Sequence, residues 1–241
     1  MRSPLNKRLF RELRGEFGKY LVIFILMTLT IGMVSGFLVA DGSMIQAYEE
    51  SFEKYSIENG HFRTEKKMNN AQIQDIEDLG IKLYENYYVE EALTNGSTMR
   101  IFKNRDEVNK VCLMKGTMPE KPGEIGIDRM YADNNDLSVG DEIESGGHTW
   151  KITGLVALSD YSALFSNNND SMFDSVKFGV SVVCPEEFDS YKADQLNYSY
   201  AWKYNTEPKN EKAEKDISED LMEDVAKEVT LEESGAVIDS F

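Results

Sequence analysis

Few residues of this chain could carry catalytic or metal-binding chemistry. The 241 residues include two histidines, His61 and His148, and two cysteines, Cys112 and Cys184. Neither histidine has a Cys, Asp or Glu at a recognisable ligand spacing, and no nucleophile stands in a pattern with a base. The sequence therefore predicts surface or structural histidines, no catalytic set and no metal site. We do not expect an enzyme.

Binding motifs for phosphate and calcium are also missing from the sequence. There is no G-x-x-x-x-G-K-[ST] loop and no G-x-G-x-x-G after a strand, so we expect no bound ATP or dinucleotide. The oxygen-rich runs 133–142 and 166–174 do not match the calcium-loop pattern and are interpreted as turns. The sequence predicts no cofactor, and any energy for work must come from another protein.

The cysteine count and the charge narrow the class of protein further. Two cysteines that lie 72 positions apart are too few for a disulfide framework, and both a single disulfide and two buried thiols remain open for Cys112 and Cys184. The net charge of −17 argues against nucleic acid, and against anionic lipid as a partner of the acidic part of the chain.

One segment stands apart from this acidic background. Residues 20–40 contain no charged side chain, and a helix of that length spans roughly the 30 Å of a bilayer's hydrocarbon core. A buried core helix would show a polar face, and a cleaved signal peptide would need a shorter apolar region with a small residue at Leu38. We therefore predict a single N-terminal transmembrane helix over 20–40.

Charge predicts the orientation of that helix. Residues 1–19 carry a net charge of +4, whereas the remaining 222 residues carry −21. The basic end of a span stays in the cytoplasm by the positive-inside rule. We therefore expect a cytoplasmic segment 1–19 and an extracytoplasmic domain 41–241 in the cell membrane, with one pass through the lipid bilayer.

Two features near the span indicate contacts with lipid and with other helices. Apolar residues of segment 1–19 recur at helical spacing, which is typical of a basic amphipathic helix that lies at the inner membrane interface. The alternative is that the basic residues only set the topology, which would explain the charge but not the apolar spacing. These apolar residues are Leu5, Leu9, Phe10, Leu13 and Phe17. Gly32 and Gly36 form a G-x-x-x-G, a weak signal for helix packing within the membrane.

The rest of the chain alternates between helix and strand patterns. Apolar residues at helical spacing predict that the span continues as a helix until Asn59-Gly60. Strand patterns then alternate with short helices, the dipeptide Asn95-Gly96 predicts a hairpin, and a last amphipathic helix carries Ile217, Leu221, Val225 and Val229. The order indicates a mixed α+β domain after the span.

The layout resembles the amino-terminal part of FtsX/MacB-like ABC transporter permeases. The basic start, the first span and the element "GTMPEKPGEIGID…LSVGDEIESGGHTWKITGLV" resemble this family's first transmembrane helix and its MacB-like extracytoplasmic core domain. The positions that carry the resemblance are Gly116, Pro119, Gly123, Glu124, Ile125, Ala132, Val139, Gly140, Asp141, Ile152, Gly154, Leu155 and Val156.

The resemblance implies a non-catalytic permease subunit that works with a separate cytoplasmic ATPase. It also implies partner spans, supplied by a second permease subunit or by the rest of the same permease, for export or force transmission. Such permeases have further spans after the exterior domain, and this sequence has no second apolar segment. We therefore expect a fragment of a longer permease, a truncated gene product or a one-span relative. The alternative is a single-pass extracytoplasmic sensor or ligand-binding protein without an ATPase partner.

Overall fold

The computed structural model describes residues 14–145, 147–161, 163–166, 170–231 and 237–240. The chain divides into two compact units, Met1–Ser51 and Phe52–Phe241. The first unit contains most of helix α2 (Phe17–Tyr55), and the second contains the last turn of α2 together with two sheets. The expected boundary at residue 41 therefore lies inside α2, ten positions before the end of the first unit.

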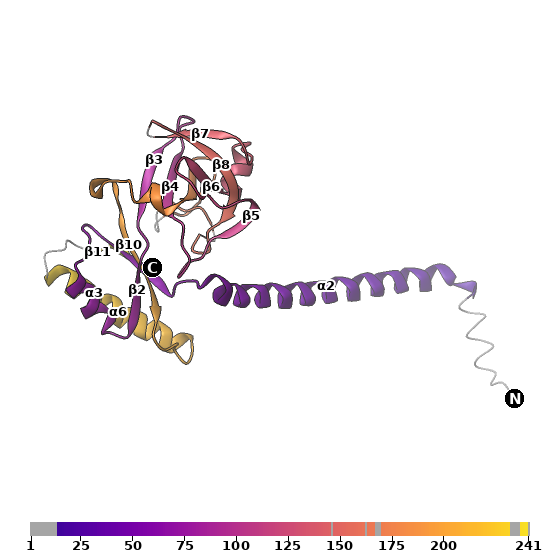
Figure 1. Ribbon diagram of the computed structural model, residues 1–241. Coiled ribbons are helices and arrows are strands. Elements are labelled where there is room, and N and C mark those ends of the chain that lie inside the picture. The colour runs from indigo at the N-terminus through magenta and orange to yellow at the C-terminus, as the bar shows by residue number, and fades with distance from the viewer. Residues whose placement is uncertain (1–13, 146, 162, 167–169, 232–236, 241) are drawn as a thin grey trace. The chain divides into compact units, whose positions relative to one another are not determined.

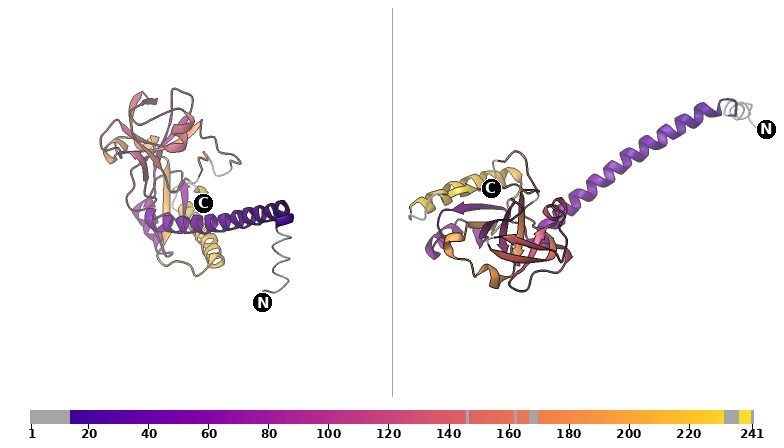
Figure 2. Two further views of the ribbon diagram at one scale, coloured as in Figure 1. Left: turned by 90° about the vertical axis from the view of Figure 1, so that its right-hand side faces the viewer. Right: turned by 90° about the horizontal axis from the view of Figure 1, so that it is seen from above.

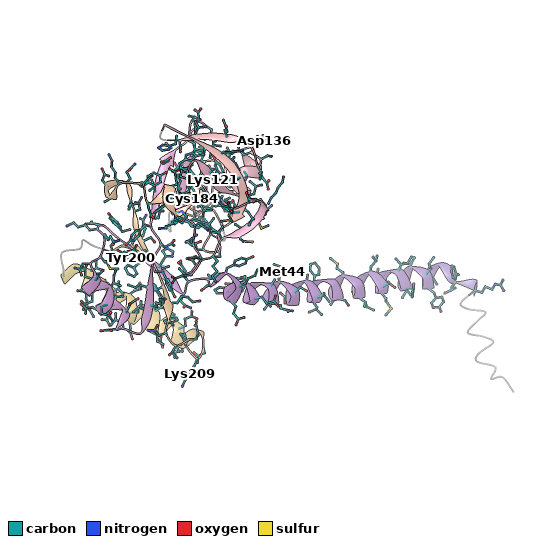
Figure 3. The ribbon with its side chains drawn as sticks, in the orientation of Figure 1. Met44, Lys121, Asp136, Cys184, Tyr200 and Lys209 are labelled. Atoms are coloured by element: carbon teal, nitrogen blue, oxygen red, sulfur yellow. The ribbon has the colours of Figure 1, made fainter. Side chains whose placement is uncertain are left out.

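Helix α2 is an unbroken helix of 39 residues. It is the one helix within the described ranges that is long and apolar enough to cross a membrane, and its most apolar stretch is entirely unburied by protein. Its side chains extend on all sides of the helix (Figure 3). Thr28 and Thr30 donate their hydroxyl hydrogens to Phe24 O and Leu26 O, both at 2.8 Å, so neither hydroxyl needs water. The described residues do not cover this stretch as they would cover a core helix.

The predicted end of this helix at Asn59-Gly60 is wrong by four residues. Ser56 adopts a left-handed φ of 50°, and its amide donates to Glu53 O at 3.3 Å while Ile57 N donates to Phe52 O at 3.1 Å. This pair of bonds is the Schellman motif that ends many helices, here without the usual glycine. Gly60 instead begins the first strand.

The smaller sheet of the second unit is antiparallel and has the order β11-β1-β10-β2. Its strands are β1 (Gly60–Thr64), β2 (Ile81–Glu85), β10 (Tyr198–Tyr204) and β11 (Val237–Ser240). Helices α3 (Asn70–Glu77) and α6 (Glu211–Leu231) lie on one face of it (Figures 1 and 2). Of the apolar stripe predicted on α6, Leu221, Val225 and Val229 are buried, whereas Ile217 is 46% exposed.

The larger sheet has the order β3-β4-β9-β6-β8-β5, with β7 paired to β8. Its strands are β3 (Tyr88–Ala92), β4 (Thr98–Lys103), β5 (Cys112–Gly116), β6 (Glu124–Asp128), β7 (Glu142–Ser145), β8 (His148–Ala157) and β9 (Phe178–Val183). The pairs β4–β9 and β6–β8 are parallel and the others are antiparallel. Short helices α4 (Arg129–Asn134) and α5 (Pro185–Phe188) and the 3-10 turn η1 (Ala193–Gln195) complete the unit. The α+β class is confirmed.

Two glycines of the motif that resembles the permease family permit a close approach of strands. Gly116 of β5 and Gly154 of β8 face each other in register. A Cβ on Gly116 would lie 2.2 Å from Thr153 O, and one on Gly154 would lie 2.5 Å from Thr117 O. No side chain fits at these distances, so the glycine types are required by packing rather than by chemistry.

The V-G-D element of the same motif is also structural. Gly140 N donates to Ile152 O at 2.8 Å, and Ile152 N donates to Asp141 O at 2.9 Å, so this turn adds two bonds to β8. The Asp141 carboxylate accepts from Ser138 N at 2.8 Å and closes the turn on itself. Gly140 has a φ of 103°, which a side chain would disfavour.

Candidate functional site at the end of the apolar helix

The last turn of α2 is joined to the rest of the second unit by a dense set of hydrogen bonds. We call this set the clasp, and it consists of residues 55–61 on one side and residues 109–112 on the other. The two segments lie 51 to 57 positions apart in the chain. The clasp is therefore a tertiary contact that fixes where the apolar helix ends.

Main-chain bonds form the centre of the clasp. Lys110 N donates to Tyr55 O at 2.8 Å, and Asn109 N donates to Ser56 O at 3.0 Å. The last four carbonyls of a helix have no partner within the helix. Together with the Schellman bonds to Phe52 O and Glu53 O, the bond from Lys110 satisfies three of those four carbonyls.

The Asn109 side chain locks the segment that follows the helix. It is fully buried, and its Oδ1 accepts from Glu58 N at 2.9 Å while its Nδ2 donates to the Glu58 carboxylate. The other carboxylate oxygen of Glu58 lies 2.7 Å from His61 Nδ1. Asn109 has a φ of 48°, a left-handed conformation that asparagine tolerates better than most residues.

Tyr55 and Cys112 extend the clasp to strand β5. The Tyr55 hydroxyl donates a hydrogen bond to Cys112 Sγ at 3.0 Å. The Cys112 thiol in turn donates to Met114 Sδ at 3.7 Å. The question left open for the cysteines is answered, since Cys112 and Cys184 are both free thiols. A hydrogen bond with Tyr55 raises the pKa of Lys54 above its ordinary value.

The arrangement holds the end of the helix against the rest of the second unit. Its centre is made of main-chain bonds, and the Glu58 carboxylate lies against both Asn109 and His61. Among the described residues, no group of three or more His, Cys, Asp or Glu could hold a metal ion.

The candidate site residues that were predicted from the sequence do not lie together in the structure. Gly32 and Gly36 lie in α2 with no heavy atom within 4 Å of a Cβ built on either, so the face they form is open. Phe17 is the first residue of α2 and is 60% exposed. Leu5, Leu9, Phe10 and Leu13 lie outside the described residues, so the interfacial helix stays a prediction.

Sequence reasoning missed the clasp entirely. The sequence shows no metal-ligand spacing around His61, and in the structure Glu58, three positions earlier, contacts this histidine. The second histidine, His148, stacks on Trp150 with ring centroids 5.5 Å apart. Asn109 carries no local pattern that predicts its role, because its partners come from a distant segment.

We predict that Asn109→Ala lowers the free energy of unfolding by about 2–4 kcal/mol, because it leaves Glu58 N and one carboxylate oxygen buried without their partner. Asp136→Ala is the matched control, since Asp136 has a similar φ of 55° but is exposed. In the control, alanine replaces a residue type that tolerates the left-handed conformation, and this lowers the free energy of unfolding by about 1 kcal/mol. Urea unfolding of the full chain in detergent, followed by tryptophan fluorescence, measures both. Equal losses in the two variants would show that the clasp bonds contribute nothing.

Comparison with known proteins gives matches among solved structures alone. No family model matches the chain, and no curated protein matches it. The chain is similar to the extracellular domain of the ABC-type transporter YknZ from Gram-positive bacteria, with 9% identity and a TM-score of 0.41, over 75% of this chain and 98% of that one.

Two further solved structures are similar. The periplasmic region of MacB from Actinobacillus actinomycetemcomitans has 9% identity and a TM-score of 0.37, over 69% of this chain and 83% of that one. A putative lipoprotein from Bacillus anthracis has 11% identity and a TM-score of 0.36, over 76% and 96%. At these identities and TM-scores, the likenesses carry no conclusion about the family or the function of this chain.

Proposed function

We propose that this chain is the membrane-anchored, non-catalytic part of an FtsX/MacB-like ABC transporter permease. A separate cytoplasmic ATPase supplies the energy, and the chain carries the resulting movement to an extracytoplasmic domain for export or force transmission. The N-terminus lies in the cytoplasm in this proposal, and residues after the span lie outside the cell membrane. The charge difference between residues 1–19 and the rest supports that orientation.

The observation that carries the proposal is the continuity of α2 from the apolar stretch to the clasp. Its 39 residues give a helix about 58 Å long, nearly twice the roughly 30 Å that a span needs. The helix has no break after the charge-free stretch and ends in bonds to the second unit. A stiff helix fixed at its end transmits a shift that a flexible tether would absorb.

The open face at Gly32 and Gly36 supports partner helices within the membrane. Without a hydrophobic drive between spans, small residues one turn apart let another helix approach closely. Ala40, one further turn along, continues the row of small residues. We propose that the remaining permease spans, or a second permease subunit, pack on this face.

We expect Gly36→Ile to weaken association of the span with a partner helix by about tenfold or more, because the added side chain separates the two backbones. Val34→Phe is the control, since residue 34 lies on the opposite side of α2 and is already large and exposed. A membrane association assay of the span measures both. If Gly36→Ile associates as well as Val34→Phe, the glycines are not a packing face.

The relay is tested by two insertions of equal length after Gly42. A helical heptapeptide, Ala-Glu-Ala-Ala-Ala-Lys-Ala, adds two turns and nearly preserves the rotation of α2, whereas Gly-Gly-Ser-Gly-Gly-Ser-Gly adds flexible chain of the same length. We expect the flexible insert to abolish activity of the complete transporter and the helical insert to retain part of it. ATP binding by the ATPase should survive in both.

The readout is growth or export in a strain that requires the intact permease. Full activity with the flexible insert would contradict the relay and favour the sensor or ligand-binding alternative, because a tether needs no stiffness. Urea unfolding of each protein shows whether the second unit stays folded. Loss of activity with both inserts, in folded proteins, would show that length and not stiffness matters.

A further inference from the structure

Strand β3 has a short open stretch on its outer edge, the side opposite to β4. At one end of this stretch, Tyr88 exchanges two main-chain hydrogen bonds with Asn197, at 2.8 and 3.2 Å. At the other end, Thr94 N donates to Glu144 O of β7 at 3.1 Å. No strand within the described ranges pairs with β3 on this side between the two contacts. Residues 89–92 therefore form an edge that lacks a neighbouring strand.

The register with β4 turns main-chain groups of this stretch outward. In an antiparallel ladder, successive residues bond alternately to one side and to the other. Both main-chain groups of Tyr88 bond outward to Asn197, so the N–H and C=O of Glu90, two positions on, also point outward. The N–H of Ala92 follows the same alternation, and both Glu90 and Ala92 are exposed. An edge with such donors and acceptors pairs readily with another strand.

A hollow of about 450 Å³ lies beside this edge. Its lining consists of residues 89–92 of β3 and of four residues from other segments, namely His148, Ser190, Tyr191 and Gln195. The volume falls within the range of small-ligand sites, and an added strand would lie about 4.8 Å from β3. Because an extended residue covers about 3.4 Å, the open stretch accommodates a segment of about three residues.

The hollow carries a negative charge that the fold does not neutralise. Glu90 is paired with Arg100 at 2.6 Å. Glu91 has no cationic partner in the part of the chain that the structure describes, and its carboxylate instead accepts hydrogen bonds from two neutral hydroxyls. The residues that line the hollow include no lysine and no arginine. A ligand with a cationic group therefore complements this lining.

The two hydroxyls hold the Glu91 carboxylate in place and leave it able to bind a ligand. Tyr191 donates to one carboxylate oxygen at 2.8 Å, and Ser145 donates to the other. Burial, together with the bond to Glu91, raises the pKa of Tyr191 well above its ordinary value, so this hydroxyl remains a donor at neutral pH. Trp150 Nε1 donates to Ser145 Oγ at 2.7 Å and so orients the second hydroxyl. Each carboxylate oxygen has a further lone pair for a ligand donor.

We propose that the outer edge of β3 binds a short extended peptide segment that carries a basic side chain. The segment adds a strand beside residues 89–92 and makes main-chain bonds to Glu90 and Ala92. Its lysine or arginine side chain pairs with Glu91. Main-chain bonds supply the affinity in such strand addition, and side-chain contacts supply the specificity. The proposal does not depend on the permease function, because it rests on residues of the second unit alone.

The test uses acetyl-Lys-Thr-Lys-amide as the probe. When its threonine pairs with Glu90, the lysines on either side lie on the face of the sheet that Glu91 occupies, because side chains alternate along a strand. Acetyl-Gln-Thr-Gln-amide lacks the charge, whereas the probe with an N-methylated threonine keeps the charge and loses a main-chain donor. Equilibrium dialysis against the full chain, in nonionic detergent at roughly 0.15 M salt, measures all three.

We expect saturable, one-to-one binding of the probe and at least about tenfold weaker binding of each analogue, the loss typical of one charge-assisted or one blocked hydrogen bond. Equal binding of the probe and its N-methylated form would show that charge attraction alone holds the peptide, and the strand addition would be wrong. Equal binding of the glutamine analogue would reject the role of Glu91. Lack of saturable binding of the probe at millimolar concentration would overturn the whole proposal.

A pair of variants locates the site. Glu91→Gln should weaken binding of the lysine probe by about tenfold or more and leave binding of the glutamine analogue unchanged. Glu142→Gln removes the same charge from an exposed residue of β7 that does not line the hollow, and it should bind the probe as the native chain does. Urea unfolding checks that both variants are folded. If the two variants lose the same affinity, net charge explains the effect and the edge of β3 is not the site.

Discussion

The apolar surface of helix α2 is the constraint on which the rest of the structure depends. Its charge-free stretch exposes large side chains such as Leu38, at 69%, and the described protein buries none of its most apolar stretch. Water solvates so much apolar surface poorly, whereas a bilayer of matching thickness accepts it. Thr28 and Thr30 satisfy their hydroxyls within the helix, as a span requires.

A second consequence is that the helix must end in a defined way outside that medium. The carbonyls of its last turn need donors, and the second unit provides one through Lys110, while Asn109 bonds the following residue. The last turn of α2 is thereby joined to the rest of the second unit through short main-chain bonds and one buried asparagine. The motif glycines Gly116 and Gly154 draw β5 against β8, and β5 carries Cys112, the partner of Tyr55.

Local features of this fold were predictable from sequence and long-range ones were not. Asn69 caps α3 with a capping box to Gln72, and Asn95-Gly96 forms the hairpin between β3 and β4, because both depend on neighbouring residues. The helix end at Ser56 was missed because a serine takes the conformation that glycine usually signals. Strands β5 and β11, the clasp and the hollow beside β3 depend on partners far along the chain, which no local pattern specifies.

Membrane topology is the most direct test of the account, because the proposed relay requires the second unit to lie outside the membrane. Two fusions after Phe241, one to alkaline phosphatase and one to green fluorescent protein, report opposite sides: phosphatase becomes active outside the cytoplasm, and the fluorescent protein matures inside it. The account predicts high phosphatase activity and no fluorescence from full-length, membrane-bound fusions. Fluorescence without phosphatase activity would place the second unit in the cytoplasm and contradict it.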